Sequence, residues 1–365
     1  MEKLNSIQYL RGFAALMVLY CHVIDFQMEF STSAQQNFFY VQNFGAIGVD
    51  IFFVISGFII SYIASGSGGK TEALDFFKRR FARVNPAYYL ASFLYFLVML
   101  LCHNIHGSYK LKHGIIKSIT ILPIFDRGTE FWNPLLILGW TMSFEWFFYI
   151  IYGGLIFYSV RTKSLLLLLI LGALTITGWL YHQTEVHYVF VTNPIIWEFC
   201  FGVVIARVYK KIKINKAVAF FFLTTGIAWY VCLIIWGYGD ISESLYTINA
   251  TLSWQRVLLW GIPSACIVMG ILFVESNYGH RFFSNKILLL LGNSSYAIYL
   301  IHPILLSIVY YVFAITDYKM QGLPPDLWIW LLIITVASGC VIYYTYIERL
   351  LVKQVNKLLH SSKEK

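Results

Sequence analysis

The chain has 365 residues, of which 59% are hydrophobic, 18% aromatic and only 12% charged. Soluble domains average about 25% charged residues, so this composition excludes a water-soluble fold. The formal net charge of +9 does not indicate a nucleic-acid partner, because the lysines and arginines stand at the ends of apolar segments rather than along one polar face.

Apolar segments long enough to cross ~30 Å of hydrocarbon recur along the whole sequence. They predict an all-α fold, a polytopic membrane helix bundle of about ten transmembrane helices within one domain over 1–350, followed by a short basic cytoplasmic tail over 351–365. A weakly apolar piece around 113–125 is predicted to lie at the membrane interface. The predicted spans are about 7–26, 44–65, 86–103, 137–158, 163–181, 192–208, 217–238, 255–274, 285–316 and 326–347.

The distribution of positive charge predicts the orientation of these spans. With the N-terminus inside, 20 of the 27 Lys and Arg residues fall on the cytoplasmic side, six fall outside, and Arg11 lies within the first span. Cytoplasmic loops carry an excess of Lys and Arg, so both termini are predicted to be cytoplasmic. The six cysteines lie in or beside apolar segments without CxxC spacing, which favours packing over disulfides, and no metal site is expected.

Ionisable residues within the predicted spans are sorted by depth. Arg11 lies near the inner end of the first span, and Arg80 and Arg83 approach the third at a similar level. The outer half holds acids and histidines, namely His22, Asp50, Glu145, Glu198 and His302. A single charge at mid-membrane costs roughly 2.5–3.5 kcal/mol, so these groups are expected to share a polar chamber that opens outward. For Asp50 and Glu198, a structural ion pair is an equally good interpretation.

Arg11 and His22 are predicted to lie on one face of the first helix. Eleven residues turn through about 1100°, which is only about 20° from three full turns, and they separate the two side chains by ~16 Å along the axis. Such a face can hold a phosphate-bearing group at its inner end and present a base at its outer end. Asp25, one turn after His22, either orients the imidazole or is a solvated interfacial acid, which is the favoured interpretation.

The segment that carries these two residues, LNSIQYLRGFAALMVLYCH, resembles the opening of the acyltransferase family 3 membrane proteins with their Arg-x10-His motif. Five later segments resemble successive blocks of that family, in the family's order. The opening is closer to the exopolysaccharide-modifying branch than to the branch with a fused esterase-like domain. The five segments are GVDIFFVISGFII (48–60), FFKRRFARVNPAYY (76–89), GWTMSFEWFFY (139–149), PIIWEFCFGV (194–203) and LGNSSYAIYLIHP (291–303).

The resemblance implies an O-acyltransferase of the bacterial inner membrane. Such an enzyme moves an acyl group, most often acetyl, from cytoplasmic acetyl-CoA to a hydroxyl of a cell-surface carbohydrate or lipid-linked glycan. The resemblance implies His22 as the catalytic histidine, Arg11 as its motif partner and Glu145 as a further catalytic residue. Guanidinium groups bind phosphates well, so Arg11, Arg80 and Arg83 are expected to bind the donor. The substrate-site candidates in the matching blocks are Asp50, Glu198, Tyr296 and His302.

Transfer to a sugar hydroxyl requires a base, and neutral His22 can take that proton. An acyl-histidine intermediate is also chemically possible, and the sequence does not choose between the two routes. Glu145 is expected to orient His22 or to stabilise its imidazolium. A transporter or flippase that uses buried His and Glu as a proton relay is the competing class, and a structural or sensory protein is a third. A transporter of that kind predicts two matching inverted halves, which the sequence does not show.

Overall fold

The computed structural model describes residues 4–30, 43–64, 68–102, 109–123, 128–129, 131, 133–181, 184–317, 319–320 and 324–360. Within these ranges the chain forms helices and no β-strand. Eight helical segments are long and apolar enough to cross a membrane, and the apolar helix Ile47–Ile63 is shorter. The predicted all-α polytopic helix bundle is therefore confirmed.

Long helices make up most of the described chain, and short helices and turns join them. The long helices are α1 (Asn5–Phe30), α3 (Ile47–Ile63), α4 (Lys70–Cys102), α5 (Tyr109–Thr120), α6 (Gly139–Gly154), α7 (Val160–Tyr181), α9 (Trp197–Lys211), α10 (Lys216–Trp236), α13 (Ile262–Tyr278), α15 (Ser295–Ile315), α16 (Pro325–Tyr343) and α17 (Arg349–His360). The short helices are α8 (Val186–Val191), α11 (Ser244–Ile248), α12 (Ser253–Arg256) and α14 (Lys286–Asn293). Two π-helical turns occur, at Val257–Gly261 before α13 and at Tyr344–Glu348 between α16 and α17.

Each of the ten predicted spans overlaps a helix, but two predictions need correction. Helix α4 begins at Lys70 and not near residue 86, because its charged first turns are helical although too polar to count as a span. Its arginines therefore belong to the helix itself. The predicted span 285–316 is two helices, α14 and α15, separated at Ser294. The Ser294 hydroxyl donates to the Leu290 carbonyl at 2.8 Å, which satisfies a backbone group at this break.

Helix α1 lies inside the bundle, where it packs against α3, α13, α14, α15 and α16. Helices α3 and α9 pack closely against each other, because glycines face the partner backbone on both of them. A Cβ atom added to Gly57 would strike the backbone of Phe199, and one added to Gly202 would strike the backbone of Val54. Small residues let membrane helices approach in this way, since van der Waals packing drives their association.

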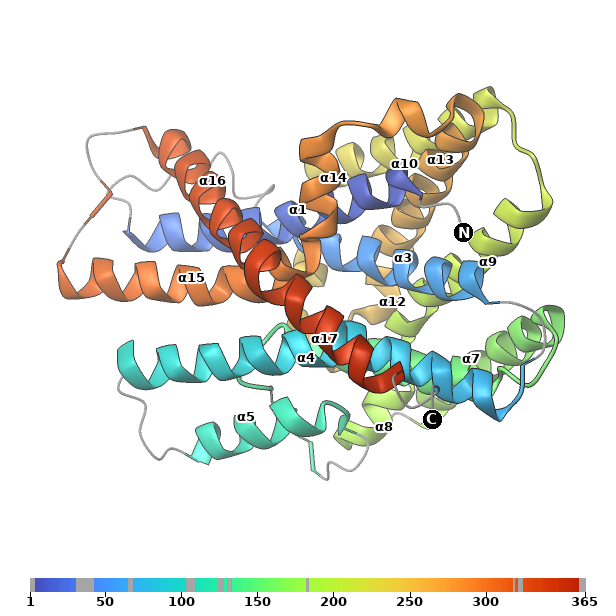
Figure 1. Ribbon diagram of the computed structural model, residues 1–365, viewed down its shortest axis with the longest axis horizontal. Coiled ribbons are helices and arrows are strands. Elements are labelled where there is room, and N and C mark those ends of the chain that lie inside the picture. The colour runs from blue at the N-terminus through green and yellow to red at the C-terminus, as the bar shows by residue number, and fades with distance from the viewer. Residues whose placement is uncertain are drawn as a thin grey trace.

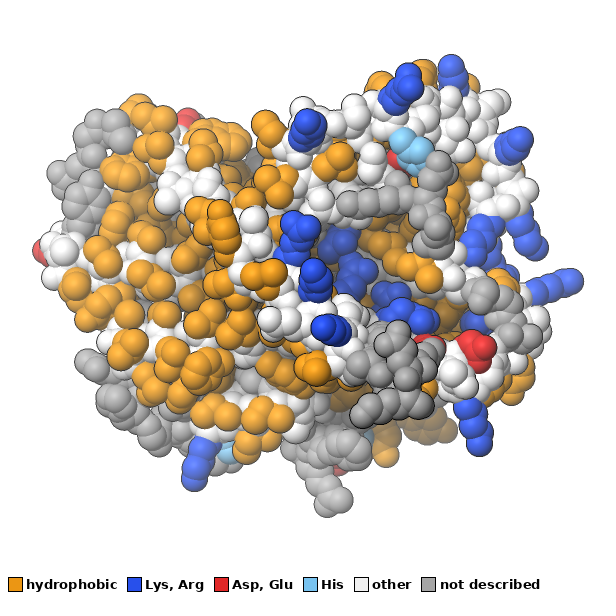
Figure 2. Space-filling model, in the orientation of Figure 1, with side chains coloured by type: hydrophobic (Ala, Val, Ile, Leu, Met, Phe, Trp, Pro, Cys, Tyr) orange, Lys and Arg blue, Asp and Glu red, His pale blue; other side chains and the backbone are white. Residues whose placement is uncertain are grey.

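The two ends of the molecule differ in charge. Figure 1 shows α1, α4 and α15 along the long axis of the view, with the chain termini marked in the same half. Figure 2 shows Lys and Arg side chains gathered in that half, while hydrophobic side chains cover the other half. The first helix therefore starts, and the last helix ends, at the basic end of the bundle.

Candidate active site

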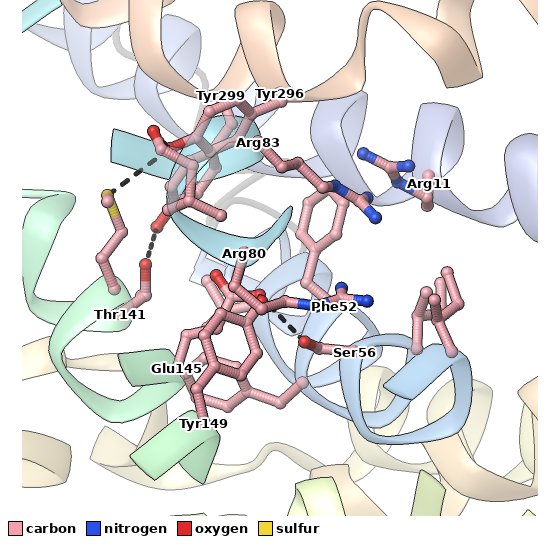
Figure 3. Close-up of a pocket in the computed structure, with 16 residues that line it drawn as sticks. Arg11, Phe52, Ser56, Arg80, Arg83, Thr141, Glu145, Tyr149, Tyr296 and Tyr299 are labelled. Carbon is pink, nitrogen blue, oxygen red and sulfur yellow. Dashed lines mark hydrogen bonds between the residues drawn. The ribbon is translucent and has the colours of Figure 1, made fainter. Parts of the chain in front are cut away.

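Three arginines from two helices line one cavity, which we call the arginine cavity. Arg11 comes from α1, and Arg80 and Arg83 come from successive turns of α4. In Figure 3 their guanidinium groups lie on one side of the cavity, with Glu145 and Thr141 across from them. Helices α3, α6 and α15 supply the remaining walls, through residues such as Phe52, Tyr149 and Tyr296. The cavity thus has a cationic side and a side rich in hydroxyl groups.

The side chains of α6 fix part of this wall. Glu145 accepts hydrogen bonds from Ser56 Oγ, at 2.8 Å, and from the hydroxyl of Tyr149. The Arg80 guanidinium lies over the rings of Phe76 and Tyr149, 5.6 and 5.7 Å from their centroids. Arg80 is only 7% exposed, and its Nε has no hydrogen-bond partner in the part of the chain that the structure describes. A buried, incompletely bonded guanidinium is suited to binding an anion.

A buried acid from the C-terminal part of the chain balances some of this positive charge. Glu348 ends the π-helical turn Tyr344–Glu348, is buried, and interacts electrostatically with Arg11 and Arg83. Such π-helical turns are frequent at functional sites. The position of Glu348, an acid at the end of the last apolar span, was the only sign of this role in the sequence. Glu348 and Glu145 are therefore two acidic neighbours of the three arginines.

A second cavity lies around His22 and is called here the histidine cavity. Its lining includes His22 and Asp25 from α1, Arg256 at the end of α12, and the turn Ser242–Ser244. The Nδ1 atom of His22 lies 3.8 Å from Asp25 Oδ2, and Asp25 is exposed. The His22 ring stacks on that of His302, with centroids 5.2 Å apart. His302 is fully buried, and its Nδ1 pairs with the Ile298 carbonyl at 2.7 Å.

The two cavities share a wall. Among the residues that the structure describes, Val49 of α3 and Tyr299 of α15 line both of them. The Tyr299 hydroxyl lies 2.9 Å from Thr141 Oγ1 and 3.4 Å from the Leu138 carbonyl oxygen. Arg11 and His22 therefore belong to different cavities that meet at this wall, although both stand on α1.

Asp50 is part of a buried ion pair. Its carboxylate accepts hydrogen bonds from Arg256 Nε at 3.0 Å and Nη2 at 2.8 Å, and both side chains are almost completely buried. Glu198 is also fully buried, interacts with Asp50, and lies against Gly261. The structure thus selects the ion-pair interpretation for Asp50. Its partner is Arg256, which stands at the edge of a predicted span.

The acids and histidines that were expected to share one outward chamber lie in three places instead. Arg11, Arg80, Arg83, Glu145 and Tyr296 line the arginine cavity. His22 and His302 stack at the histidine cavity, and Asp50 and Glu198 belong to the ion-paired core. Glu145 lies among the arginines, where Ser56 and Tyr149 bond it, so the expectation that it orients His22 is corrected. The sequence predicts how deep Glu145 lies in the membrane, but it does not predict which neighbouring helices its side chain faces.

Arg256, Tyr299 and Glu348 are three site residues that the sequence did not predict. Arg256 stands at the edge of an apolar span, where an arginine is an ordinary topology signal. Tyr299 is one of 26 tyrosines, and its position one turn before His302 was the only available sign of its place. Within the described residues, no group of three or more His, Cys, Asp or Glu side chains is arranged to hold a metal ion.

Comparison with known proteins identifies the family. The acyltransferase domain of the acyltransferase 3 family matches residues 4–344. The exopolysaccharide production protein ExoZ of Rhizobium meliloti is 29% identical over 266 residues, which are 73% of this chain and 78% of that protein. The O-acetyl transferase of Shigella phage Sf6 is 30% identical over 188 residues, 49% of this chain and 54% of that protein.

The O-acetyltransferase OatA of Staphylococcus aureus is 23% identical over 338 residues, 83% of this chain and 52% of that protein. No solved structure shows a significant match. The family match favours an enzyme over a transporter or a structural protein, because it covers nearly all of the helix bundle that holds both cavities. The chain belongs to the acyltransferase 3 family, and it is a membrane-embedded acyltransferase.

Proposed function

We propose that the protein transfers an acetyl group from acetyl-CoA to a hydroxyl of a cell-surface carbohydrate or lipid-linked glycan. The names of its relatives support this choice, since they include two O-acetyltransferases and an exopolysaccharide production protein. The acetyl donor enters from the cytoplasm at the basic end of the bundle. The cytoplasmic membrane of a bacterium is the proposed location, with both termini in the cytoplasm.

The observation that carries the proposal is the pair of cavities along α1. Three arginines line one cavity, His22 lines the other and stacks on the buried His302, and Val49 and Tyr299 line both cavities. Arg11 and His22 are separated by ~16 Å along α1. Acetyl-CoA has a matching form, because a polyanionic phosphate end is joined to its thioester by a slender, flexible arm. The arginines bind the phosphates, and the arm brings the thioester to the wall beside His22.

At that wall, His22 acts on the acceptor. Its imidazole takes the proton of the carbohydrate hydroxyl, which is a poor nucleophile at neutral pH, as the oxygen attacks the thioester carbonyl. The exposed Asp25 and the open side of the histidine cavity give the acceptor access. His302 holds the His22 ring by stacking, and the buried Asp50–Arg256 pair fixes the neighbouring helix ends. Glu145 holds Tyr149 and the arginine wall in place.

The direct test uses membrane vesicles from host cells with and without the protein, because these vesicles contain the native acceptor. Inverted vesicles expose the cytoplasmic face, so added [¹⁴C]acetyl-CoA reaches the arginine cavity. We expect alkali-labile radiolabel in the glycan fraction of inverted vesicles that contain the protein, and none in vesicles that lack it. Right-side-out vesicles with the protein are expected to stay unlabelled. Labelling that is equal with and without the protein contradicts the proposed function.

A further inference from the structure

We propose that the hydroxyl of Tyr299 donates the hydrogen bond that stabilises the carbonyl oxygen of the acyl group during transfer. The proposal rests on the proposed function, since it concerns the same thioester and the same histidine. Tyr299 then acts as a catalytic residue at the passage between the arginine cavity and the histidine cavity.

The position of Tyr299 is the first support. An acyl group that travels from the arginines to His22 must pass the wall shared by the two cavities, where the structure places Val49 and Tyr299. Val49 offers only methyl groups to the passing group. Tyr299 offers a hydroxyl, and so it provides the polar group of this shared wall.

The position of Tyr299 relative to the proposed base, His22, is the second support. Tyr299 stands three residues before His302 on α15, and residues three apart on a helix are neighbours on one face. The His302 ring stacks on His22 with a centroid separation of 5.2 Å. Tyr299 and His22 also line the same histidine cavity, so a carbonyl group bonded to the Tyr299 hydroxyl is proposed to face the imidazole that activates the acceptor.

The hydroxyl is also held in place before the reaction. Thr141 Oγ1 donates to the Leu138 carbonyl at 2.9 Å, so the Tyr299 hydroxyl has two acceptors for its proton, Thr141 Oγ1 at 2.9 Å and the Leu138 carbonyl at 3.4 Å. The ring is only 6% exposed. Rotation about the bond between ring and oxygen turns the proton toward the cavity without moving the ring. A donor fixed in a buried site stabilises developing charge strongly, because it needs little reorganisation.

Arg256, the cation in the histidine cavity, does not replace this donor. Its Nε and one Nη2 proton bond Asp50, and the other Nη2 proton bonds the Ala46 carbonyl. Its two Nη1 protons bond the Ile241 carbonyl and Thr247 Oγ1. A guanidinium has five such protons, so all are committed. Arg256 therefore stabilises the structure around the cavity, and the hydrogen bond to the oxyanion is assigned to Tyr299.

The proposed step moves the acyl group from the thioester sulfur to the acceptor oxygen. The acceptor hydroxyl gives its proton to His22, and its oxygen forms a bond to the thioester carbonyl carbon. The carbonyl electron pair moves to oxygen, where the Tyr299 hydroxyl donates to it. The intermediate then collapses, the carbon–sulfur bond breaks, and the leaving thiolate of coenzyme A takes the proton from the His22 imidazolium. The products are the O-acyl ester and free coenzyme A.

Tyr299→Phe tests the proposal because it removes only the hydroxyl. Thr141 keeps its bond to Leu138, so no partner is left unsatisfied. Removal of one oxyanion donor lowers kcat by about 10²–10³-fold. We expect a loss of this size for [¹⁴C]acetyl transfer in inverted vesicles, with the KM for acetyl-CoA and the Kd of the purified protein for acetyl-CoA unchanged.

Tyr230→Phe is the matched control. Tyr230 is buried, bonds a side-chain hydroxyl (Ser264, 2.5 Å) and a backbone carbonyl (Trp260, 2.8 Å), and lines neither cavity. It should lose stability but keep kcat. A Tyr299→Phe variant with kcat within threefold of wild type overturns the proposal, and so does one that loses acetyl-CoA binding together with kcat. An inactive wild type would instead overturn the proposed function.

Discussion

The imidazole rings of His22 and His302 stack with centroids 5.2 Å apart and planes inclined by 29°. They come from α1 and α15, and His302 is fully buried while His22 borders the histidine cavity. The stacking fixes the His22 ring from one side and leaves its other side to the cavity. This arrangement suits the proposed role of His22 as the base, with the buried His302 as its support.

We predict that His22→Gln abolishes acyl transfer and leaves donor binding intact. Glutamine keeps a polar side chain but cannot take a proton, so the rate should fall by about 10²–10⁴-fold. The arginine cavity does not include His22, so the Kd for acetyl-CoA should stay at its wild-type value. Transfer of [¹⁴C]acetyl in inverted vesicles and binding to the purified protein measure the two quantities. His187→Gln, outside both cavities, is the control, and substantial transfer by a well-expressed His22→Gln variant would refute the assigned role.

The buried pair of Asp50 and Arg256 predicts strong coupling between two single substitutions. Either Asp50→Asn or Arg256→Met leaves one buried charge uncompensated, which costs about 3–5 kcal/mol. The double variant removes both charges and should be more stable than the sum of the two single losses indicates. Thermal unfolding of the purified proteins in detergent measures the coupling. Losses that simply add would show that the two charges do not stabilise each other.

Much of the fold could be predicted from the sequence, because apolar length and the positions of Lys and Arg follow from the physics of the bilayer. Each span predicted from hydropathy overlaps a helix, and eight helical segments among the described residues are long and apolar enough to cross a membrane. Depth along each span predicted the layer of Arg11 and of His22. Depth does not give the order of the helices around the bundle. Asp50 and Arg256 are 206 positions apart, and no local pattern relates them. Glu145 was assigned to His22 for the same reason, since equal depth looked like proximity.

The close contact of α3 with α9 predicts that Gly57→Ala destabilises the protein. The added methyl group would meet the Phe199 backbone, which cannot move aside as a flexible side chain would. Overpacking of this kind costs typically about 1–3 kcal/mol. Gly154→Ala on α6 is the matched control, because open space surrounds that position. Melting temperatures in detergent distinguish the variants, and equal values for both would contradict the packing argument.

The charge distribution predicts that the histidine cavity opens to the outer face of the membrane. Cys21 lines that cavity and is partly exposed, whereas Cys200 and Cys340 are buried. In a variant that keeps only Cys21, a membrane-impermeant maleimide should label spheroplasts. Variants that keep only Cys200 or only Cys340 should stay unlabelled. Labelling of Cys21 in inverted vesicles but not in spheroplasts would contradict the proposed orientation. It would place the histidine cavity on the cytoplasmic side and the donor cavity on the outer side.

The arginines of α4 lead to the last prediction, which separates donor binding from helix anchoring. Arg80 and Arg83 line the arginine cavity, whereas Lys78 on the same helix donates to the Leu359 carbonyl at 3.4 Å. All three are basic residues near the same membrane surface, so each contributes to topology. Among these three, only the two arginines line the cavity that we propose binds the phosphates of acetyl-CoA.

A hydrogen bond to a charged group contributes about 1.5–3 kcal/mol, and every 1.4 kcal/mol changes an equilibrium constant tenfold. Arg80→Ala and Arg83→Ala should therefore raise the Kd of the purified protein for acetyl-CoA by about 10–100-fold, while Lys78→Ala leaves it unchanged. Salt should weaken wild-type binding more than binding by either arginine variant, because each variant has lost a phosphate contact. Equal affinities in all three variants would show that the α4 arginines anchor the helix and do not bind the donor.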